Sequence, residues 1–279
     1  MKNSTLLITS MLLLISGMGF TQKHQLVKRW QTDSLLKVPE SVLFDPENKL
    51  LYVSNIDGDA AQKDGKGSIG KVALDGKIIQ VDWISGLNAP KGMGLYKGNL
   101  YVSDVSEVIV IDIRKGTITK RIPVEGATFL NDLTINNKGI VYVSDSRQKK
   151  VHRIENGTPS VILDSLSLKG PNGLLVHNEV LYVLDAGSMY KMESDKKLTK
   201  IADGMEGSTD GIENVQGNEF IVSCWIGAVY YINADGSKEK LLDTQGEKIN
   251  SADIGYDAKK RILYVPTFMK NSIVAYDVK

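Results

Sequence analysis

Four oxygen-donor side chains stand at equivalent positions along the chain, each two residues before an apolar residue that starts a short stretch of strand character. They are two carboxylates and two carboxamides: Glu40, Asn131, Asn172 and Asp210. Hard divalent cations such as Ca²⁺ take roughly six to eight oxygen ligands of this kind, with water completing the shell. If the fold brings the four segments together, the pattern predicts a divalent-cation site, with Ca²⁺ preferred and Mg²⁺, Mn²⁺ or Zn²⁺ as other ions to test.

Each of these residues also has a structural explanation. Asn172 and Asp210 each precede a glycine, as is typical of turns, and Glu40 can be an exposed loop charge. The two remaining equivalent positions hold Lys91 and Ala252. An ammonium group at Lys91 could pair with a carboxylate and occupy the place of the metal, or it could bind a carbonyl or carboxylate of a substrate. The sequence leaves both alternatives open.

The elements that would position these residues form a repeat. One short string recurs six times, with starts separated by 49, 41, 40, 39 and 43 residues. The copies are Leu51-Tyr-Val-Ser-Asn55, Leu100-Tyr-Val-Ser-Asp104, Val141-Tyr-Val-Ser-Asp145, Leu181-Tyr-Val-Leu-Asp185, Phe220-Ile-Val-Ser-Cys224 and Leu263-Tyr-Val-Pro-Thr267. A period of about 40 residues matches a four-stranded propeller blade. We therefore predict an all-β, six-bladed β-propeller, whose innermost strands place the four oxygen donors around one axis.

The two ends of the repeat array predict how the ring closes. The last repeat ends with a third strand at Ile273–Val278, and His24–Gln31 precedes the first repeat without a partner of its own. We expect the latter to supply the missing outer strand of the last blade, since unpaired sheet edges favour aggregation. One domain, residues 22–279, follows. Its longest insertion, at residues 57–67, is rich in Gly, Asp and Lys and is predicted to be a mobile loop. The polar residues that end the second strands (Asn55, Asp104, Asp145, Asp185) are expected to bond the following turn.

Residues 1–21 have the pattern of a secretory signal peptide: Lys2, an apolar run from Leu6 to Phe20, and small residues at its end. The run is too short and too broken for a membrane span. No cysteine lies near the expected cleavage site, which argues against a lipoprotein. We expect an exported, periplasmic or extracellular protein that is monomeric.

Four motifs resemble the regucalcin/gluconolactonase group of six-bladed propellers, and the likeness extends over nearly the whole mature chain. They are Pro39-Glu40-Ser41, Leu130-Asn131-Asp132, Pro171-Asn172-Gly173 and Thr209-Asp210-Gly211. The resemblance implies one divalent metal on Glu40, Asn131, Asn172 and Asp210, with Asp210 also transferring a proton in lactone hydrolysis. The chain departs from that group where an arginine usually grips a sugar, since this position is Phe129.

The function expected from the resemblance is metal-dependent hydrolysis of a lactone or related small ester. The ion would act as a Lewis acid on the carbonyl and acidify a bound water. Asp210 or Asp132 would move the proton, and Lys91 is the third candidate catalytic residue. Trp225, Phe268 and Phe129 could wall an apolar pocket or simply pack in the core.

Other chemistries find little support. The histidines are scattered and lack zinc-ligand spacing, and no nucleophile elbow, P-loop or dinucleotide fingerprint is present. Cys224 is the only cysteine and is expected to be a buried strand residue. With 34 basic and 33 acidic residues interspersed, nothing indicates nucleic-acid binding. The alternative function is a non-catalytic, ligand- or protein-binding propeller, because the recurring string also resembles NHL and YVTN repeats. A condensation of the strictosidine-synthase type is a third, weaker possibility, because that group needs no metal.

Overall fold

The computed structural model describes residues 23–279, so the predicted signal peptide lies outside the described residues. The six recurring strings each form the second strand of a four-stranded antiparallel sheet. Their apolar side chains are mostly buried on both faces because each sheet packs against a neighbouring sheet on either side. These second strands are β3 (Leu50–Asn55), β7 (Asn99–Asp104), β11 (Val141–Asp145), β15 (Val180–Asp185), β19 (Glu219–Cys224) and β23 (Ile262–Pro266).

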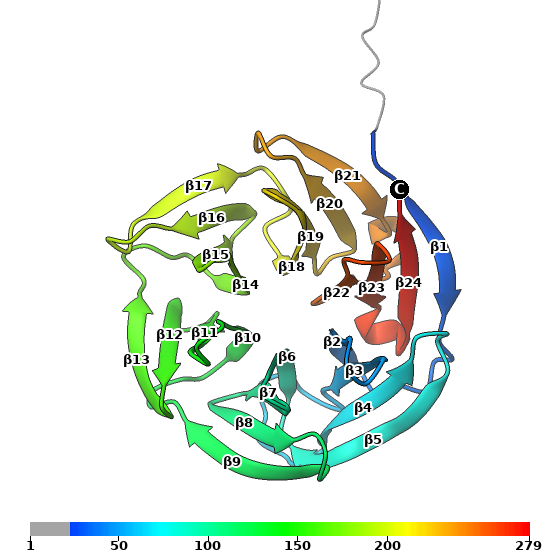
Figure 1. The fold of residues 1–279 in the computed structure, drawn as a ribbon, viewed down its shortest axis with the longest axis vertical. Helices are drawn as coiled ribbons and strands as arrows, with labels where there is room; N and C mark the ends of the chain where they lie inside the picture. The colour runs from blue at the N-terminus through cyan, green and yellow to red at the C-terminus, as the bar shows by residue number, and fades with distance from the viewer. Residues whose placement is uncertain (1–22) are drawn as a thin grey trace, which may run out of the picture.

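The six sheets are the blades of a propeller, and their innermost strands surround a common axis (Figure 1). Blade 1 adds β2 (Pro39–Asp45), β4 (Gly67–Ala73) and β5 (Ile78–Leu87) to β3. Blade 2 adds β6 (Pro90–Tyr96), β8 (Glu107–Asp112) and β9 (Thr117–Pro123) to β7. Blade 3 adds β10 (Leu130–Ile135), β12 (Lys150–Glu155) and β13 (Thr158–Leu163) to β11.

The other three blades follow the same plan. Blade 4 adds β14 (Pro171–His177), β16 (Ser188–Met192) and β17 (Leu198–Ala202) to β15. Blade 5 adds β18 (Thr209–Gln216), β20 (Ala228–Ile232) and β21 (Lys238–Asp243) to β19. Blade 6 adds β22 (Gly255–Asp257), β24 (Ile273–Val278) and β1 (Leu26–Gln31) to β23. The predicted six-bladed, all-β architecture is confirmed.

The N-terminal strand completes the last blade, as predicted. β1 lies beside β24 at the outer edge of blade 6, where the blue and red ends of the chain meet in Figure 1. The two strands are antiparallel, and the backbone groups of Gln25 and Lys279 bond each other at 2.9 and 3.0 Å. Trp30 in β1 also donates its indole N–H to the carbonyl of Leu74 in blade 1, at 2.9 Å. The closing strand therefore contacts both blades that flank the seam.

The innermost strands begin earlier than the hydrophobic pattern indicates. The strands were expected to begin at apolar residues such as Val42, but β2 begins at Pro39 and β14 at Pro171. The oxygen-donor residues are therefore the second residues of their strands and not residues of the preceding turns. This placement fixes their side chains on the ladder that lines the axis.

The connections include two short 3-10 helices, η1 (Gln245–Glu247) and η2 (Phe268–Lys270). No helix within residues 23–279 has the length and apolar character needed to cross a membrane. The insertion between β3 and β4 is free of strands, as expected, but it is not detached from the fold: Ala60 lies against the end of the central channel.

Candidate functional site

Five of the six aligned positions meet in one cavity of about 300 Å³ at one end of the central channel. Each residue is carried in by the innermost strand of a different blade, from β2 to β18. We call Glu40, Asn131, Asn172 and Asp210 the oxygen ring. The complete lining consists of Glu40, Ile56, Ala60, Lys91, Phe129, Asn131, Asn172, Ser208, Asp210, Trp225 and Phe268.

The two carboxyl groups of the oxygen ring are buried and influence each other. Burial, followed by the negative charges of Asp210 and Asp253, raises the pKa of Glu40 well above its ordinary value, and the positive charge of Lys91 opposes this rise. Burial and Asp253 likewise raise the pKa of Asp210, against a hydrogen bond from Asn172 that lowers it. Full ionisation of both groups without a compensating positive charge is therefore unfavourable.

The two carboxamides are held in fixed orientations. Asn172 donates from Nδ2 to Asp210 Oδ1 at 2.8 Å, and Asn131 donates from Nδ2 to Ser146 Oγ at 3.0 Å. Because each amide nitrogen is committed to a protein acceptor, the amide oxygens are left for other partners. Within residues 23–279, the buried atoms Asn172 Oδ1 and Glu40 Oε2 have no hydrogen-bond partner. An unpaired buried oxygen costs about 1–3 kcal/mol, and a cation or ligand donor would remove that cost.

The residues present therefore fit a hard, oxygen-seeking cation only if carboxylates and amide oxygens bind it together. No group of three or more His, Cys, Asp or Glu side chains in the described part of the chain is placed to hold a metal ion. The amide oxygens of Asn131 and Asn172 are thus needed beside Glu40 and Asp210. Carbonyl-type oxygens mixed with few carboxylates suit Ca²⁺ better than Zn²⁺, which prefers nitrogen and sulfur ligands.

Lys91 does not take the place expected for a metal. Its ammonium group donates to the backbone carbonyls of Ala60, at 2.8 Å, and Ala89, at 2.9 Å. It also lies 4.5 Å from the centre of the Phe129 ring. No ion pair joins it to a carboxylate of the oxygen ring within residues 23–279. Its charge is near enough to lower the pKa of Glu40, yet its protons are directed to the loop.

Asp132 lies outside this cavity. It lines a second cavity of about 250 Å³, deeper in the channel. Its Oδ1 accepts the N–H of Leu133 and its Oδ2 accepts the N–H of Leu174, both at 2.6 Å. Asp132 therefore ties β10 to β14 and is not within the group of residues that could handle a substrate with Asp210. This geometry favours a structural role for the residue.

The deeper cavity holds two acidic residues that sequence reasoning missed, Asp253 and Glu213. Burial raises the pKa of Asp253 to about 7, although Ser41 Oγ donates to it at 2.6 Å. Burial and the charge of Asp253 raise the pKa of Glu213 to about 8. Both could have been found in the same alignment of the six blades. Asp253, like Asp132, stands one residue after the oxygen-ring position of its blade, and Glu213 stands three residues after it.

In some blades the residue directly after the oxygen-ring position is a glycine, which allows neighbouring strands to approach closely. A Cβ atom on Gly92 would collide with Asp132, and one on Gly211 would collide with the backbone N of Ile254 and with Asp253. The narrow channel thus requires Gly in some blades and lets Ser or Asp reach across in others.

Three aromatic residues named in the sequence analysis line the cavity together. We call Phe129, Trp225 and Phe268 the aromatic wall: Phe129 directly precedes β10, Trp225 lies between β19 and β20, and Phe268 begins η2 between β23 and β24. Trp225 and Phe268 pack edge to face, with ring centroids 5.4 Å apart. Phe129 stands where the arginine was expected, and its ring contacts two cations, Lys91 and Arg147.

The polar residues that end the second strands are structural, but they bond the loop before their blade more than the turn after it. Asp104 accepts the backbone N–H groups of Asn88, at 2.9 Å, and Ala89, at 2.8 Å. Asp185 accepts those of Lys169 and Gly170 in the same way. Each of these loops leads into an innermost strand, so these residues help to fix the mouth of the channel.

Comparison with known proteins places the chain by its fold. No known family profile matches it. A segment of 60 residues is 48% identical to mechanosensory abnormality protein 6 of Caenorhabditis elegans, and this match covers 22% of the chain and 15% of that protein. The matched part is thus a small fraction of the relative.

Solved structures of similar fold include a streptogramin B lyase, with 11% identity, a TM-score of 0.68, and coverage of 92% of this chain and 98% of that one. A gluconolactonase from Xanthomonas campestris shares 16% identity with a TM-score of 0.66, over 88% of this chain and 87% of its own. A chain of the nidogen/laminin complex shares 17% identity with a TM-score of 0.64, over 78% and 84%. The chain is a six-bladed β-propeller similar in fold to a streptogramin B lyase, a gluconolactonase and a chain of the nidogen/laminin complex, and its predicted likeness to lactonase-type propellers holds at the level of the fold.

Proposed function

We propose that this propeller is a divalent-metal-dependent hydrolase of a lactone or related small ester. The observation that carries the proposal is the convergence of four oxygen donors from four blades on one cavity, where Glu40 Oε2 and Asn172 Oδ1 are buried without a hydrogen-bond partner in the described chain. Two buried carboxylates and two oriented amides are a costly arrangement unless a cation is bound there.

The residues of the chain would divide the work. Glu40, Asn131, Asn172 and Asp210 would hold the ion, which when bound polarises the carbonyl of the substrate and lowers the pKa of water. Asp210 is the proton-transfer group, because its carboxyl group lines the cavity beside the other residues that would hold the ion. Asn172 fixes the orientation of the Asp210 carboxylate through its 2.8 Å hydrogen bond. Lys91 adds positive charge beside the site without entering the oxygen ring.

Thermal unfolding tests the metal directly. The protein is melted in EDTA and then with excess Ca²⁺, Mg²⁺, Mn²⁺ or Zn²⁺. A ligand at one hundred times its Kd stabilises by about 2.7 kcal/mol, which corresponds to a rise in Tm of roughly 5–10 °C for a domain of this size. Asp210→Ala should abolish the rise and the hydrolysis of a lactone panel.

The matched control is Glu213→Gln, which alters a carboxylate of the same channel but in the deeper cavity. This variant should keep the metal-dependent rise in Tm. If no metal changes the Tm of the unaltered protein, the hydrolase proposal fails, and a non-catalytic binding propeller becomes the better account.

A further inference from the structure

The cavity is lined by two chemically different groups of residues. The oxygen ring comes from the innermost strands β2, β10, β14 and β18, whereas the aromatic wall, Ile56 and Ala60 come from the connections between strands. Within residues 23–279, Ser208 is the only polar lining residue besides Lys91 and the oxygen ring, and its hydroxyl already accepts the N–H of Ile226 at 3.4 Å. The hydroxyl groups of a polyhydroxylated substrate would therefore find few partners among the aromatic wall, Ile56 and Ala60.

Trp225 is fixed in place by its backbone although its side chain is partly open to solvent. Its N–H donates to the carbonyl of Ser208 at 2.8 Å, and its carbonyl accepts from Asn250 Nδ2 at 3.0 Å and from Ser251 N at 3.3 Å. The residue is nevertheless 37% exposed. An aromatic residue whose backbone is held in place and whose side chain is partly uncovered is suited to contact a ligand.

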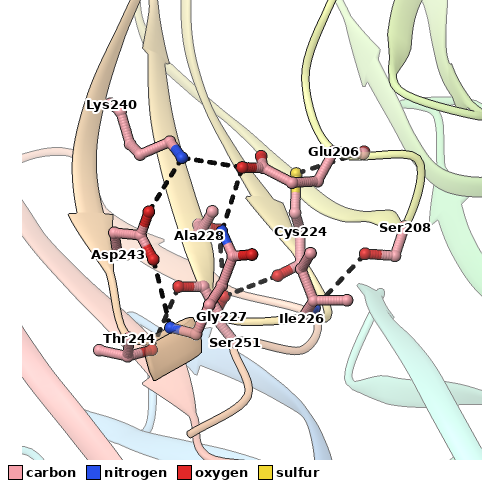
Figure 2. Close-up of polar contacts among 11 residues, drawn as sticks. Glu206, Ser208, Cys224, Ile226, Gly227, Ala228, Lys240, Asp243, Thr244 and Ser251 are labelled. Carbon is pink, nitrogen blue, oxygen red and sulfur yellow. Dashed lines mark hydrogen bonds and ion pairs between the residues drawn. The ribbon is translucent and has the colours of Figure 1, made fainter. Parts of the chain in front are cut away.

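The turn that carries Trp225 is anchored from below, as Figure 2 shows for the residues on either side of it. Ser251 Oγ donates to the carbonyls of Cys224, at 2.9 Å, and Ala228, at 3.1 Å. Thr244 donates its N–H to the carbonyl of Gly227 at 2.7 Å. Gly227 has φ of 108°, and a Cβ there would collide with a neighbouring backbone carbonyl, so the turn requires glycine.

A charged network supports the same region. Lys240 Nζ lies 2.8 Å from Glu206 Oε1 and 3.0 Å from Asp243 Oδ2, next to the buried thiol of Cys224 (Figure 2). Burial opposes ionisation of Glu206, but hydrogen bonds from Lys240 and Tyr230 outweigh it and lower the pKa of this carboxyl group to about 2. The turn is thus preformed, and ligand binding would not have to order it.

Phe268, the partner of Trp225, adopts a backbone conformation that is unfavourable for a bulky residue. Its φ is 47°, in the left-handed region, which costs about 1–3 kcal/mol for a side chain of this kind. Hydrogen bonds between Thr267 and Ser272 on either side hold the segment in this shape, among them Thr267 Oγ1 to Ser272 O at 2.8 Å. The strained backbone directs an aromatic ring into the cavity.

We propose that the aromatic wall binds an apolar arm of the substrate, so that the site selects lactones or esters bearing an alkyl or aryl substituent over sugar lactones. This inference rests on the proposed function and specifies its substrate class. The reacting carbonyl lies at the oxygen ring, and the arm extends along Trp225 and Phe268 toward Ile226 and Met269, which are 37% and 63% exposed. These two residues directly follow Trp225 and Phe268 in the sequence.

Kinetics on a homologous series test the selectivity. γ-Butyrolactone, γ-hexalactone and γ-nonalactone share one reacting ring and differ only in the alkyl arm. We expect kcat/KM to rise about threefold per added methylene, close to the gain for burying that group, and to exceed the value for glucono-1,5-lactone. Trp225→Ala should flatten the series, and Trp225→Phe should restore most of the slope. Ile79→Ala, which removes an exposed apolar residue of β5, is the control and should leave the slope unchanged.

A binding measurement separates this inference from the hydrolase proposal. Titration calorimetry compares pyrrolidin-2-one with 5-pentylpyrrolidin-2-one, a lactam that keeps the ring and arm but resists hydrolysis. Tighter binding of the pentyl compound that is lost in Trp225→Ala supports the apolar arm even if no lactone is hydrolysed. Hydrolysis with a flat series, a preference for glucono-1,5-lactone, or equal binding of the two lactams overturns the inference while leaving the hydrolase intact.

Discussion

At the scale of single residues, Lys91 shows how a charge can be buried beside acidic groups without neutralising them. Its ammonium group donates hydrogen bonds to the carbonyls of Ala60 and Ala89 and lies over the Phe129 ring. Burial lowers its pKa, and the charges of nearby acidic residues, Glu40 first, act against this. The residue thus links the insertion before β4 to the start of β6, directly beside the oxygen ring.

Lys91→Met is expected to detach this insertion. The substitution keeps the length of the side chain but leaves two carbonyls unpaired, at a cost of about 1–3 kcal/mol each if they stay buried. Residues 57–66 should then move more freely, so limited trypsin digestion should cut after Lys63 and Lys66 faster than in the unaltered protein. The metal-dependent rise in Tm should be present before the substitution; a rise seen only in Lys91→Met would show that the ammonium group blocks the metal.

The oxygen ring was predictable from the sequence because four residues share one phase of a clear repeat. The partners of Lys91 were not, because backbone carbonyls leave no trace in residue identity and the insertion that supplies one of them follows no pattern. Asp132 stands next to Asn131 but lines a different cavity, because successive strand residues point to opposite sides. Its carboxylate therefore reaches a neighbouring strand, where two N–H groups occupy it.

At the scale of elements, the polar residue that ends the second strand fixes the loop that enters the blade in blades 1 to 4. Asp104 at the end of β7 is fully buried and accepts two backbone N–H groups from the connection between β5 and β6. Ala89 in this connection is also an acceptor for Lys91. The shape of the channel mouth therefore depends on residues that do not line it.

Asp104→Ala should be strongly destabilising. It leaves two N–H groups unpaired in a buried position, and we expect a loss of about 3–5 kcal/mol in the free energy of unfolding and a fall of roughly 10 °C in Tm. Denaturant unfolding checks the first value and calorimetry the second. Asp75→Ala is the control, because this residue bonds a backbone N–H in an exposed turn. Equal effects of the two substitutions would argue against the anchoring role.

Turn chemistry made several hairpins predictable. Asn156 and Gly157 both have positive φ, at 52° and 80°, as the tight turn between β12 and β13 requires. The starts of the innermost strands were less predictable, because polar residues at the channel axis interrupt the apolar pattern used to locate them.

At the scale of the whole molecule, the ring is closed at two radii. The outer closure is the pairing of β1 with β24. The inner closure joins blade 6 to blade 1: Asp253 donates its N–H to the carbonyl of Glu40 at 2.9 Å, and Ser41 Oγ donates to its carboxyl group at 2.6 Å. A titratable group therefore lies within the seam.

This seam should make stability depend on pH. Burial raises the pKa of Asp253 to about 7 in the folded protein, whereas an unfolded Asp has a pKa near 3.8. The folded state thus binds the Asp253 proton more tightly than the unfolded state does. The stabilisation from this protonation is complete below about pH 4 and is lost as the pH rises to 7 and above. Asp253→Asn cannot ionise and should avoid that loss.

Urea unfolding in EDTA between pH 4.5 and pH 8.5 measures the effect. With rising pH, the free energy of unfolding of Asp253→Asn should increase relative to that of the unaltered protein, by up to about 3 kcal/mol across the range. Parallel pH profiles for the two proteins would show that Asp253 is already ionised in the folded state.

Blade 6 is built from β1 and from the last three strands, and this has a consequence for biosynthesis. Because β1 is among the first described segments to be translated and β24 is among the last, the nascent chain cannot complete its sixth sheet until β24 has been synthesised. The other five blades can form as the chain emerges, but blade 6 awaits β24, with Arg29 and Asp277 meeting across 248 positions of sequence. Until then β1 lacks its partner strand. A chaperone or a transport factor can therefore bind the polypeptide before the ring closes.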